Sequence, residues 1–322
     1  MKKIFATSSE FGIHSQKLID DFLGPLGISL VRYEHRGPMS EEDLLKISPE
    51  YEAIAAYSMD AITEKVLDHF PKLKIVARHG IGFDTVDIKA AARRGIFVTN
   101  THEGAFEERA VSDLTMGLLL ALARRIIDLS ASTKAGNWER PLTADLWGST
   151  LGVIGLGRIG KMTALKAKAF GMNVIAYDIF QDEEFASAHE ITYVSLDELL
   201  RRSDFVTLHC PLTEENKGLI GERELSLMKP GAFLINCARG ALVDENALYE
   251  ALKSGKLGGA GLDVYSKEPP KSNKLLELPN VIAMPHVGAY THKTMNAMDM
   301  LVVKSCADAL RGLRPANVVN GL

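Results

Sequence analysis

The sequence predicts an α/β protein with two doubly wound parallel sheets, and three observations support this fold class. Short apolar runs rich in β-branched residues alternate with amphipathic stretches of helical length, which is typical of βαβ units. A long stretch with an apolar stripe, from Glu107 to Leu129, interrupts the alternation, which resumes at Thr150. The 322 residues also suit two domains of about 150 residues each.

In the first hundred residues, glycine or proline stands at the junctions between the runs, as at Gly24-Pro25 and Pro71. The expected strands are Lys3–Thr7, Ile28–Tyr33, Ala53–Ala56, Leu73–Ala77 and Ile96–Thr99. The expected helices between them are Ser15–Leu23, Glu41–Ile47, Thr63–Phe70 and Val86–Arg94. This order predicts a first parallel sheet.

The stretch from Glu107 to Leu129 is expected to be a single long helix that connects two lobes. Its apolar residues recur at helical spacing, at Val111, Leu114, Leu118, Leu122, Ile126 and Leu129. Beyond it, the expected strands are Thr150–Ile154, Asn173–Tyr177, Phe205–Leu208, Ala232–Asn236, Gly259–Val264 and Val281–Met284. The expected helices are Arg158–Phe170, Asp197–Arg202, Asn246–Ser254 and a last one at Lys293–Leu310.

The composition, 46% hydrophobic and 24% charged, is that of a globular protein. A formal net charge of −4 leaves no basic field that would attract nucleic acid or an anionic membrane. The three cysteines form no CxxC pair and indicate reduced thiols. The N-terminus lacks the apolar stretch of a signal peptide, and no apolar run reaches the roughly 20 residues that span a bilayer. We therefore expect a cytoplasmic protein without nucleic-acid or membrane partners.

A glycine-rich segment follows the expected strand Thr150–Ile154 and opens the next helix. It reads Gly155, Leu156, Gly157, Arg158, Ile159, Gly160. The first glycine permits a tight turn, the second lets a pyrophosphate approach the backbone, and the third lets helix and strand pack closely. The helix N-terminus then offers free N–H groups to the phosphates. Strand before and helix after make this a Rossmann fingerprint, so we expect a bound dinucleotide.

Asp178 stands at the end of the following strand, eighteen residues beyond Gly160. A carboxylate at this place accepts hydrogen bonds from the ribose hydroxyls of the adenosine and repels a 2′-phosphate. The next residues, Ile179 and Phe180, supply no arginine for such a phosphate. The sequence therefore predicts NAD, rather than NADP, as cofactor.

Three polar residues follow later strands, at the carboxyl ends where open α/β sheets bind ligands. They are Arg239, Glu268 and His286. An acid, a guanidinium and an imidazole near a dinucleotide suit a carbonyl/hydroxyl redox step. The sequence alone leaves Arg239 open as a surface ion-pair residue and Glu268, before Pro269, as a turn residue.

These motifs, in their order and spacing, resemble the D-isomer-specific 2-hydroxyacid dehydrogenase family over nearly the whole chain. The resemblance rests on Gly155–Gly160 with Asp178, Cys210–Thr213, Asn236–Gly240, Gly261–Val264, Glu268-Pro269 and Pro285–Gly288. It implies that Arg239 binds the substrate carboxylate and that His286 is the acid/base, paired with Glu268. It further implies cofactor contacts at Cys210, Pro211, Thr213, Asn216, Cys237, Ala238, Asp263 and Gly288. A carboxylate beside an imidazole favours its protonated form.

The resemblance also implies a discontinuous substrate domain, residues 1–100 and 288–322, around an NAD-binding domain, residues 101–287. The chain is expected to cross between them at about Asn100–Glu108. The long helix belongs to a dimer interface in this family, so a homodimer is expected; a helix buried within one subunit is the alternative.

In the substrate lobe, Arg78, His79, Gly80 and Ile81 resemble the family's glycine loop, whose N–H groups form a carboxylate nest. Phosphoglycerate dehydrogenases of the family carry an arginine for the phosphate where Tyr57 stands here. Their regulatory extension is also not expected, because the chain stops soon after its last helix. Small 2-hydroxy acids such as glycerate or lactate are therefore favoured as substrates, with Arg78 left open as a phosphate partner.

The same motifs occur in proteins with other functions. Formate dehydrogenases of the family carry glutamine where Glu268 stands, which disfavours that activity. Phosphite oxidation, and an NAD-sensing corepressor of the same fold, stay open as alternatives. A zinc alcohol dehydrogenase is disfavoured, because no cysteine cluster is available for a metal, and no metal is expected.

Overall fold

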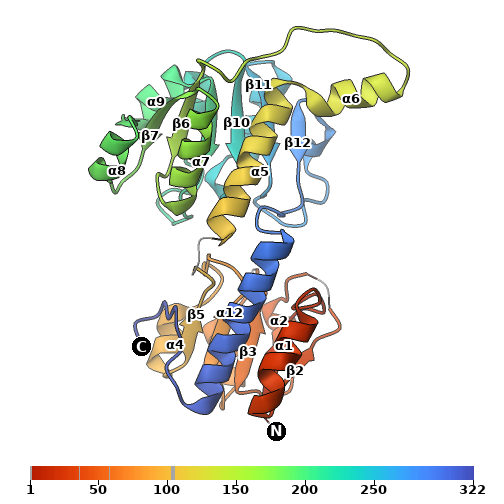
Figure 1. Ribbon diagram of the computed structural model, residues 1–322, viewed down its shortest axis with the longest axis vertical. Helices are drawn as coiled ribbons and strands as arrows, with labels where there is room; N and C mark the ends of the chain where they lie inside the picture. Colours follow the sequence, from red (N-terminus) through yellow and green to blue (C-terminus); the bar gives the residue numbers. More distant parts are fainter. Residues whose placement is uncertain (1, 36, 58, 103–105) are drawn as a thin grey trace. The chain divides into compact units, whose positions relative to one another are not determined.

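The computed structural model describes residues 2–35, 37–57, 59–102 and 106–322. The chain divides into two compact units (Figure 1). Unit 1 comprises Met1–Glu107 and Tyr290–Leu322, and unit 2 comprises Glu108–Ala289. The expected crossing at about Asn100–Glu108 includes residues 103–105, which lie outside the described residues.

The described part of unit 1 contains a parallel sheet of five strands in the order β2-β1-β3-β4-β5. The strands are β1 (Lys2–Ala6), β2 (Ile28–Arg32), β3 (Ala53–Ala56), β4 (Ile75–Arg78) and β5 (Phe97–Thr99). The helices are α1 (Gln16–Leu23), α2 (Glu41–Leu44), α3 (Glu64–His69), α4 (Ile88–Arg93) and α12 (His292–Arg311), with a 3₁₀ turn at Gly24–Leu26.

Helices cover both faces of this sheet because successive strand residues point to opposite sides. On β1, Ile4 packs on one face with Ile19 of α1 and Val303 of α12. Its neighbour Phe5 packs on the other face, where α2, α3 and α4 bury residues such as Leu67. The C-terminal helix α12, together with α1, thus covers one face of a sheet whose strands all come from the first hundred residues (Figure 1).

Unit 2 contains a second parallel sheet, whose described strands follow the order β12-β11-β10-β9-β6-β7-β8. They are β6 (Thr150–Ile154), β7 (Asn173–Tyr177), β8 (Thr192–Tyr193), β9 (Phe205–Leu208), β10 (Ala232–Asn236), β11 (Leu257–Leu262) and β12 (Val281–Ala283). The helices are α5 (Phe106–Ala123), α6 (Ile126–Lys134), α7 (Arg158–Ala169), α8 (Glu183–Ala188), α9 (Leu196–Arg202), α10 (Glu222–Leu227) and α11 (Glu245–Lys253), with 3₁₀ turns at Gly240–Leu242 and Lys274–Glu277.

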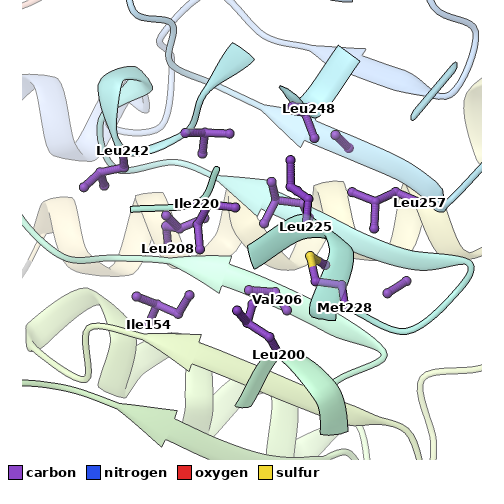
Figure 2. Packing of buried hydrophobic residues seen from close by; sticks show 14 of the residues in the cluster. Ile154, Leu200, Val206, Leu208, Ile220, Leu225, Met228, Leu242, Leu248 and Leu257 are labelled. Atoms are coloured by element: carbon purple, nitrogen blue, oxygen red, sulfur yellow. The ribbon is translucent and has the colours of Figure 1, made fainter. Parts of the chain in front are cut away.

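Two hydrophobic layers hold this sheet between helices. One layer joins α5 and α7 to strand residues such as Val153 and Ile235. The other joins α9, α10 and α11 to residues such as Val206 (Figure 2). Both sheets are therefore doubly wound, and the predicted fold class is confirmed. The short elements α8, β8 and α10 were not predicted.

The expectation of one continuous helix from Glu107 to Leu129 was wrong. Helix α5 ends at Ala123, whose carbonyl accepts the N–H of Ala144 at 3.0 Å. Arg125 then adopts a left-handed conformation with φ 50°, and α6 begins after it. The apolar stripe continues through Ile126, but that side chain is 52% exposed, so it does not extend the core.

Candidate active site

An imidazole–carboxylate pair lies at the carboxyl-terminal side of the sheet in unit 2. Nδ1 of His286, which follows β12, is 2.6 Å from Oε2 of Glu268. The other carboxylate oxygen accepts the main-chain N–H of Tyr265 at 3.0 Å, which fixes Glu268 in place. Among the residues that the structure describes, Nε2 of His286 has no hydrogen-bond partner, and the side chain is 34% exposed. This nitrogen is therefore available to a ligand.

A strained turn orients His286. The residue has a φ of 56°, in the left-handed region that side chains other than glycine rarely adopt. The buried carboxylate of Asp263, which follows β11, accepts the N–H groups of Val287 and Gly288, each at 2.8 Å. Burial raises the pKa of Asp263, while these two hydrogen bonds oppose the rise. Asp263 thus holds the backbone immediately after the imidazole.

Arg239 follows β10 and is half-buried. Its Nη1 donates to the carbonyl of Ala238 at 2.8 Å. The buried amide of Asn236 fixes the loop, since Nδ2 donates to the Arg239 carbonyl at 2.9 Å and Oδ1 accepts the Ala238 N–H at 3.0 Å. A Cβ on Gly240 would lie 1.9 Å from the carbonyl carbon of Tyr265, so only glycine lets this loop approach the segment that leads to Glu268.

The glycine loop between β6 and α7 has the shape of a phosphate cradle. Gly155 has a φ of 92°, and a Cβ on Gly160 would lie 2.1 Å from the Gly155 carbonyl oxygen. A Cβ on Gly157 would meet nothing within 4 Å, so a ligand can approach the backbone there. Gly157 is the N-cap of α7 and provides no side-chain cap for the helix N–H groups. Ile159 lies in the first turn, and Arg158 lies 3.5 Å from the Glu108 carboxylate.

Asp178 stands directly after β7 and is tied to the glycine loop. Its Oδ2 accepts the N–H of Leu156 at 2.7 Å, and its Oδ1 accepts the N–H of Phe180 at 3.0 Å. The carboxylate is thereby held beside the cradle. Each oxygen retains a lone pair for a further donor. This geometry fits the ribose of a dinucleotide whose pyrophosphate lies on the loop.

The loop Cys210–Thr213 after β9 is fixed by Asn216. The Asn216 amide accepts the Thr213 N–H at 2.7 Å and donates to the Pro211 carbonyl at 2.8 Å. Asn216 therefore uses its side chain to shape this loop. Burial raises the pKa of Cys210 to about 11 and that of Cys237 to about 12, so both remain thiols at neutral pH.

In unit 1, Arg78 and His79 bind the protein itself. The Arg78 guanidinium is buried and donates to the carbonyls of Gly82 and Tyr57. His79 is also buried, with Nε2 2.9 Å from Oδ1 of Asp299. Both side chains thus support the loop from inside, and the Arg78 guanidinium is taken up by main-chain carbonyls.

The main chain of this loop, unlike its side chains, has polar groups available to a ligand. Gly80 has a φ of 147°, and its carbonyl accepts the Thr101 N–H at 3.3 Å. The Ile81 carbonyl accepts the Asn100 amide at 2.8 Å. No acceptor for the N–H groups of Gly80 and Ile81 is found in the described parts of the chain. These two donors are available to an anion.

A cavity of about 380 Å³ lies in unit 1. The hydroxyls of Tyr57 and Tyr290 meet there at 3.0 Å, and burial raises the pKa of both phenols, so they stay neutral. The lining found among the described residues also includes Glu10 and three histidines, His14, His79 and His292, but no lysine or arginine. His292 packs edge-on against His14, with ring centroids 5.9 Å apart.

The described residues contain no group of three or more His, Cys, Asp or Glu side chains arranged to hold a metal ion. None of their helices is long and apolar enough to cross a membrane.

The fold and cradle of unit 2 define a dinucleotide-binding protein. Residues 116–288 match the family model "D-isomer specific 2-hydroxyacid dehydrogenase, NAD binding domain". The chain is 43% identical to glyoxylate reductase of Thermococcus litoralis over 286 residues, which is 86% of each chain. It is 44% identical to D-3-phosphoglycerate dehydrogenase of Methanocaldococcus jannaschii over 285 residues. The chain belongs to the D-isomer-specific 2-hydroxyacid dehydrogenase family.

The structural comparison agrees with this assignment. A D-lactate dehydrogenase of Aquifex aeolicus, solved with NAD and lactic acid, superposes with a TM-score of 0.85 at 33% identity, covering 97% of this chain and 96% of that one. The protein is therefore an NAD-dependent oxidoreductase, and the residues of the cradle fit the cofactor. The match to the phosphoglycerate dehydrogenase covers 88% of this chain but only 54% of that protein, so the chain spans about half of its length.

Sequence reasoning missed three side chains that complete these arrangements: Tyr290, Asp299 and His209. The first two lie on or before the last helix, far in sequence from Tyr57 and His79, which they contact. No local pattern signals such partners. His209 directly precedes the Cys210–Thr213 motif, and its position after an apolar strand is the one signal in the sequence that could have pointed to it.

Proposed function

We propose that the protein interconverts a small, unphosphorylated D-2-hydroxy acid and its 2-oxo acid. The observation that carries this proposal is the 2.6 Å contact between His286 and Glu268, with Nε2 of the imidazole left without a described partner. Bound NAD supplies the hydride acceptor or donor. The remaining tasks, which are anchoring the acid and moving its hydroxyl proton, fall to the side chains of the protein.

His286 is the proposed acid/base. In the reducing direction Nε2 donates a proton to the carbonyl oxygen, and in the oxidising direction it accepts the proton of the hydroxyl. Glu268 holds Nδ1, which sets the orientation of the ring. Asp263 contributes by holding the backbone of Val287 and Gly288.

The proposed carboxylate anchor is Arg239, because a guanidinium matches the two oxygens of a carboxylate. Its backbone is fixed by Asn236, which reduces the entropy lost when a ligand binds. The N–H groups of Gly80 and Ile81 are the proposed nest in unit 1, with Arg78 supporting the loop rather than contacting substrate.

The preference for an unphosphorylated acid rests on the cavity of unit 1. Phosphate recognition normally uses arginine or lysine, and the described lining offers a tyrosine pair and Glu10 instead. Arg78, the other candidate for a phosphate, is buried and donates to main-chain carbonyls. Neutral hydroxyls suit a short polar or apolar substrate tail.

We also propose that unit 2, Glu108–Ala289, is the NAD-binding domain, which was expected at residues 101–287, and that unit 1 is the substrate domain. The fingerprint, Asp178 and the Cys210–Thr213 loop all belong to unit 2. The tyrosine-lined cavity and the nest belong to unit 1. Limited proteolysis with and without NADH tests this, since ligand protection should map to unit 2.

A homodimer is the proposed assembly, with the α6 region at the interface. Helix α6 has no buried residue, and Ile126 and Ile127 on it are 52% and 55% exposed. Trp138, just beyond, is 81% exposed. Exposed apolar groups on one segment are typical of an interface between subunits. The mass of the protein in solution tests this, and the variant Ile127→Asp should shift a dimer towards monomer.

The proposed location is the cytoplasm. Cys210, Cys237 and Cys306 are all free thiols, as expected in a reducing compartment. Cell fractionation with an antibody against the protein tests the location directly.

The experiment that tests the proposed activity is a panel of 2-oxo acids offered with NADH. Glyoxylate, hydroxypyruvate, pyruvate and 3-phosphohydroxypyruvate are compared by the loss of nicotinamide absorbance. We expect turnover of at least one unphosphorylated acid, and near-complete loss of this turnover in His286→Ala. A protein that binds NADH but turns over none of them is instead a binding or sensing protein.

A further inference from the structure

His209 occupies the point in unit 2 where the order of the strands turns. From β6, the first strand of this sheet in sequence, the chain builds β7 and β8 on one side and then returns to place β9 on the other. Leu208 of β9 pairs with Ile154 of β6, and the next N–H, of His209, donates to the Ile154 carbonyl at 2.8 Å. In open parallel sheets this switch point, beyond the carboxyl ends of the strands, is where ligands bind.

Of the two ring nitrogens of His209, one has a hydrogen-bond partner and the other has none among the residues described. Nε2 of His209 lies 3.1 Å from Oγ1 of Thr207, a fully buried side chain. Nδ1 is sealed from solvent and has no hydrogen-bond partner among the residues described. Buried polar atoms without partners are uncommon in folded proteins, and each one costs stability. A buried nitrogen without a partner, at the edge of the sheet where ligands bind, therefore indicates that a bound ligand supplies the hydrogen-bond partner.

The proton on the ring can be assigned from Thr207. Within the described structure, the imidazole is the only hydrogen-bond partner of the Thr207 hydroxyl. The Thr207 hydroxyl can use its proton in a hydrogen bond only by donating it to Nε2 of His209. Nε2 is then the acceptor, so a neutral ring carries its own proton on Nδ1. Burial lowers the pKa of His209 to about 3, so the ring is neutral at physiological pH. Nδ1–H is thus an uncharged donor that needs an acceptor.

The glycine loop lies against this residue. A Cβ on Gly155 would be 2.8 Å from the carbonyl carbon of His209 and 2.6 Å from the nitrogen of Cys210. The backbone that cradles the pyrophosphate and the backbone that carries the imidazole are therefore in direct contact. The acceptors that a dinucleotide brings to this edge are the oxygens of its phosphates and riboses.

We propose that Nδ1–H of His209 donates a hydrogen bond to an oxygen of bound NAD. His209 is then a cofactor-binding residue, and Thr207 a positioning residue that fixes the tautomer of its ring. The inference concerns NAD binding by unit 2 and does not depend on which 2-oxo acid is the substrate.

Two variants of His209 separate binding from folding. His209→Phe keeps a ring but removes the donor, whereas His209→Asn keeps an amide donor near the position of Nδ1. The Kd for NADH is measured by fluorescence titration without substrate, and the Tm is measured without NADH. His189→Phe is the matched control, because His189 lies in the same unit, at the end of α8.

We expect His209→Phe to raise the Kd for NADH about tenfold, as for the loss of one buried hydrogen bond to a ligand. Its Tm without NADH should be equal to or above that of the wild type, since an unsatisfied donor has been removed. His209→Asn should retain most of the affinity, and His189→Phe all of it. Thr207→Val should raise the Kd less than His209→Phe does.

An unchanged Kd in His209→Phe would overturn the proposal. So would a lowered Tm with equal loss of affinity in both His209 variants, which is the signature of a purely structural residue. Wild-type protein that binds NADH normally while failing the 2-oxo acid panel would remove the proposed activity and leave this inference standing.

Discussion

Oε2 of Glu268 and Nδ1 of His286 are 2.6 Å apart, although eighteen positions separate the two residues in sequence. The contact joins the segment after β11 to the turn after β12. Glu268 is in turn held by the N–H of Tyr265, so the imidazole is bound to a fixed carboxylate. A glutamine in place of Glu268 would keep the shape of the side chain and remove its negative charge.

The variant Glu268→Gln should therefore lower kcat/KM for 2-oxo acids about tenfold or more, because a charge-assisted hydrogen bond to Nδ1 is replaced by a weaker neutral one. The Kd for NADH should hardly change, since the pair lies outside the glycine loop. Measuring kcat/KM with the best 2-oxo acid checks this, with Glu250→Gln on α11 as control. Equal kcat/KM in wild type and Glu268→Gln would remove the pair from the mechanism.

Replacing Arg239 by lysine should lower kcat/KM for 2-oxo acids about tenfold or more, because one charge is kept but the two-pronged contact with the carboxylate is lost. The Kd for NADH should hardly change. The matched control is Arg201→Lys, whose guanidinium makes an exposed ion pair with Asp197 at 3.6 Å. If kcat/KM were the same for every 2-oxo acid, Arg239 would not be the anchor.

Unphosphorylated acids should be turned over at least as efficiently as phosphorylated ones. The check is kcat/KM for D-glycerate against 3-phosphoglycerate. In Tyr57→Arg, a guanidinium enters the cavity lining, and the ratio should shift about tenfold towards the phosphorylated acid. Tyr57→Phe, which only removes the hydroxyl bonded to Tyr290, should not cause this shift. A strong preference of the wild type for 3-phosphoglycerate would contradict the substrate proposal.

NADH should be used in preference to NADPH at matched concentrations, because the Asp178 carboxylate stands beside the cradle. The double variant Asp178→Ala with Ile179→Arg should relax this preference. Ile179→Arg alone, which keeps the carboxylate, is the control. Steady-state rates with both cofactors provide the measurement, and equal use of NADPH by the wild type would show that Asp178 does not select the cofactor.

The fold was predictable because its signals are local. Apolar runs of four to six residues between helical stretches located most strands, and the fingerprint around Gly155–Gly160 located the cradle. The break at Arg125 was not predictable, since a left-handed arginine leaves no mark in the sequence, unlike a glycine. The exposed stripe at Ile126 looks the same in sequence as a buried one.

The sequence singled out the residues proposed for the site, but it did not indicate what each side chain contacts in the fold. Asn216, Arg78 and Asp263 were expected to contact cofactor or substrate, and in the structure their polar atoms bind the main chain of neighbouring loops. Such contacts depend on loop conformation, which spacing does not encode. His209 shows the converse, because an unsatisfied nitrogen can be recognised only after every other partner has been located.

Isotopic labelling shows whether hydride transfer at C2 is coupled to a proton from His286. Pyruvate is incubated with NADH that carries deuterium at the transferable position, and lactate is analysed by mass spectrometry and chiral separation. We expect D-lactate with one deuterium at C2, formed by the wild type and nearly abolished in His286→Ala, whose Kd for NADH stays normal. Hydroxypyruvate replaces pyruvate if the panel shows it to be the better substrate. Unlabelled product, L-lactate, or undiminished turnover in His286→Ala would contradict it.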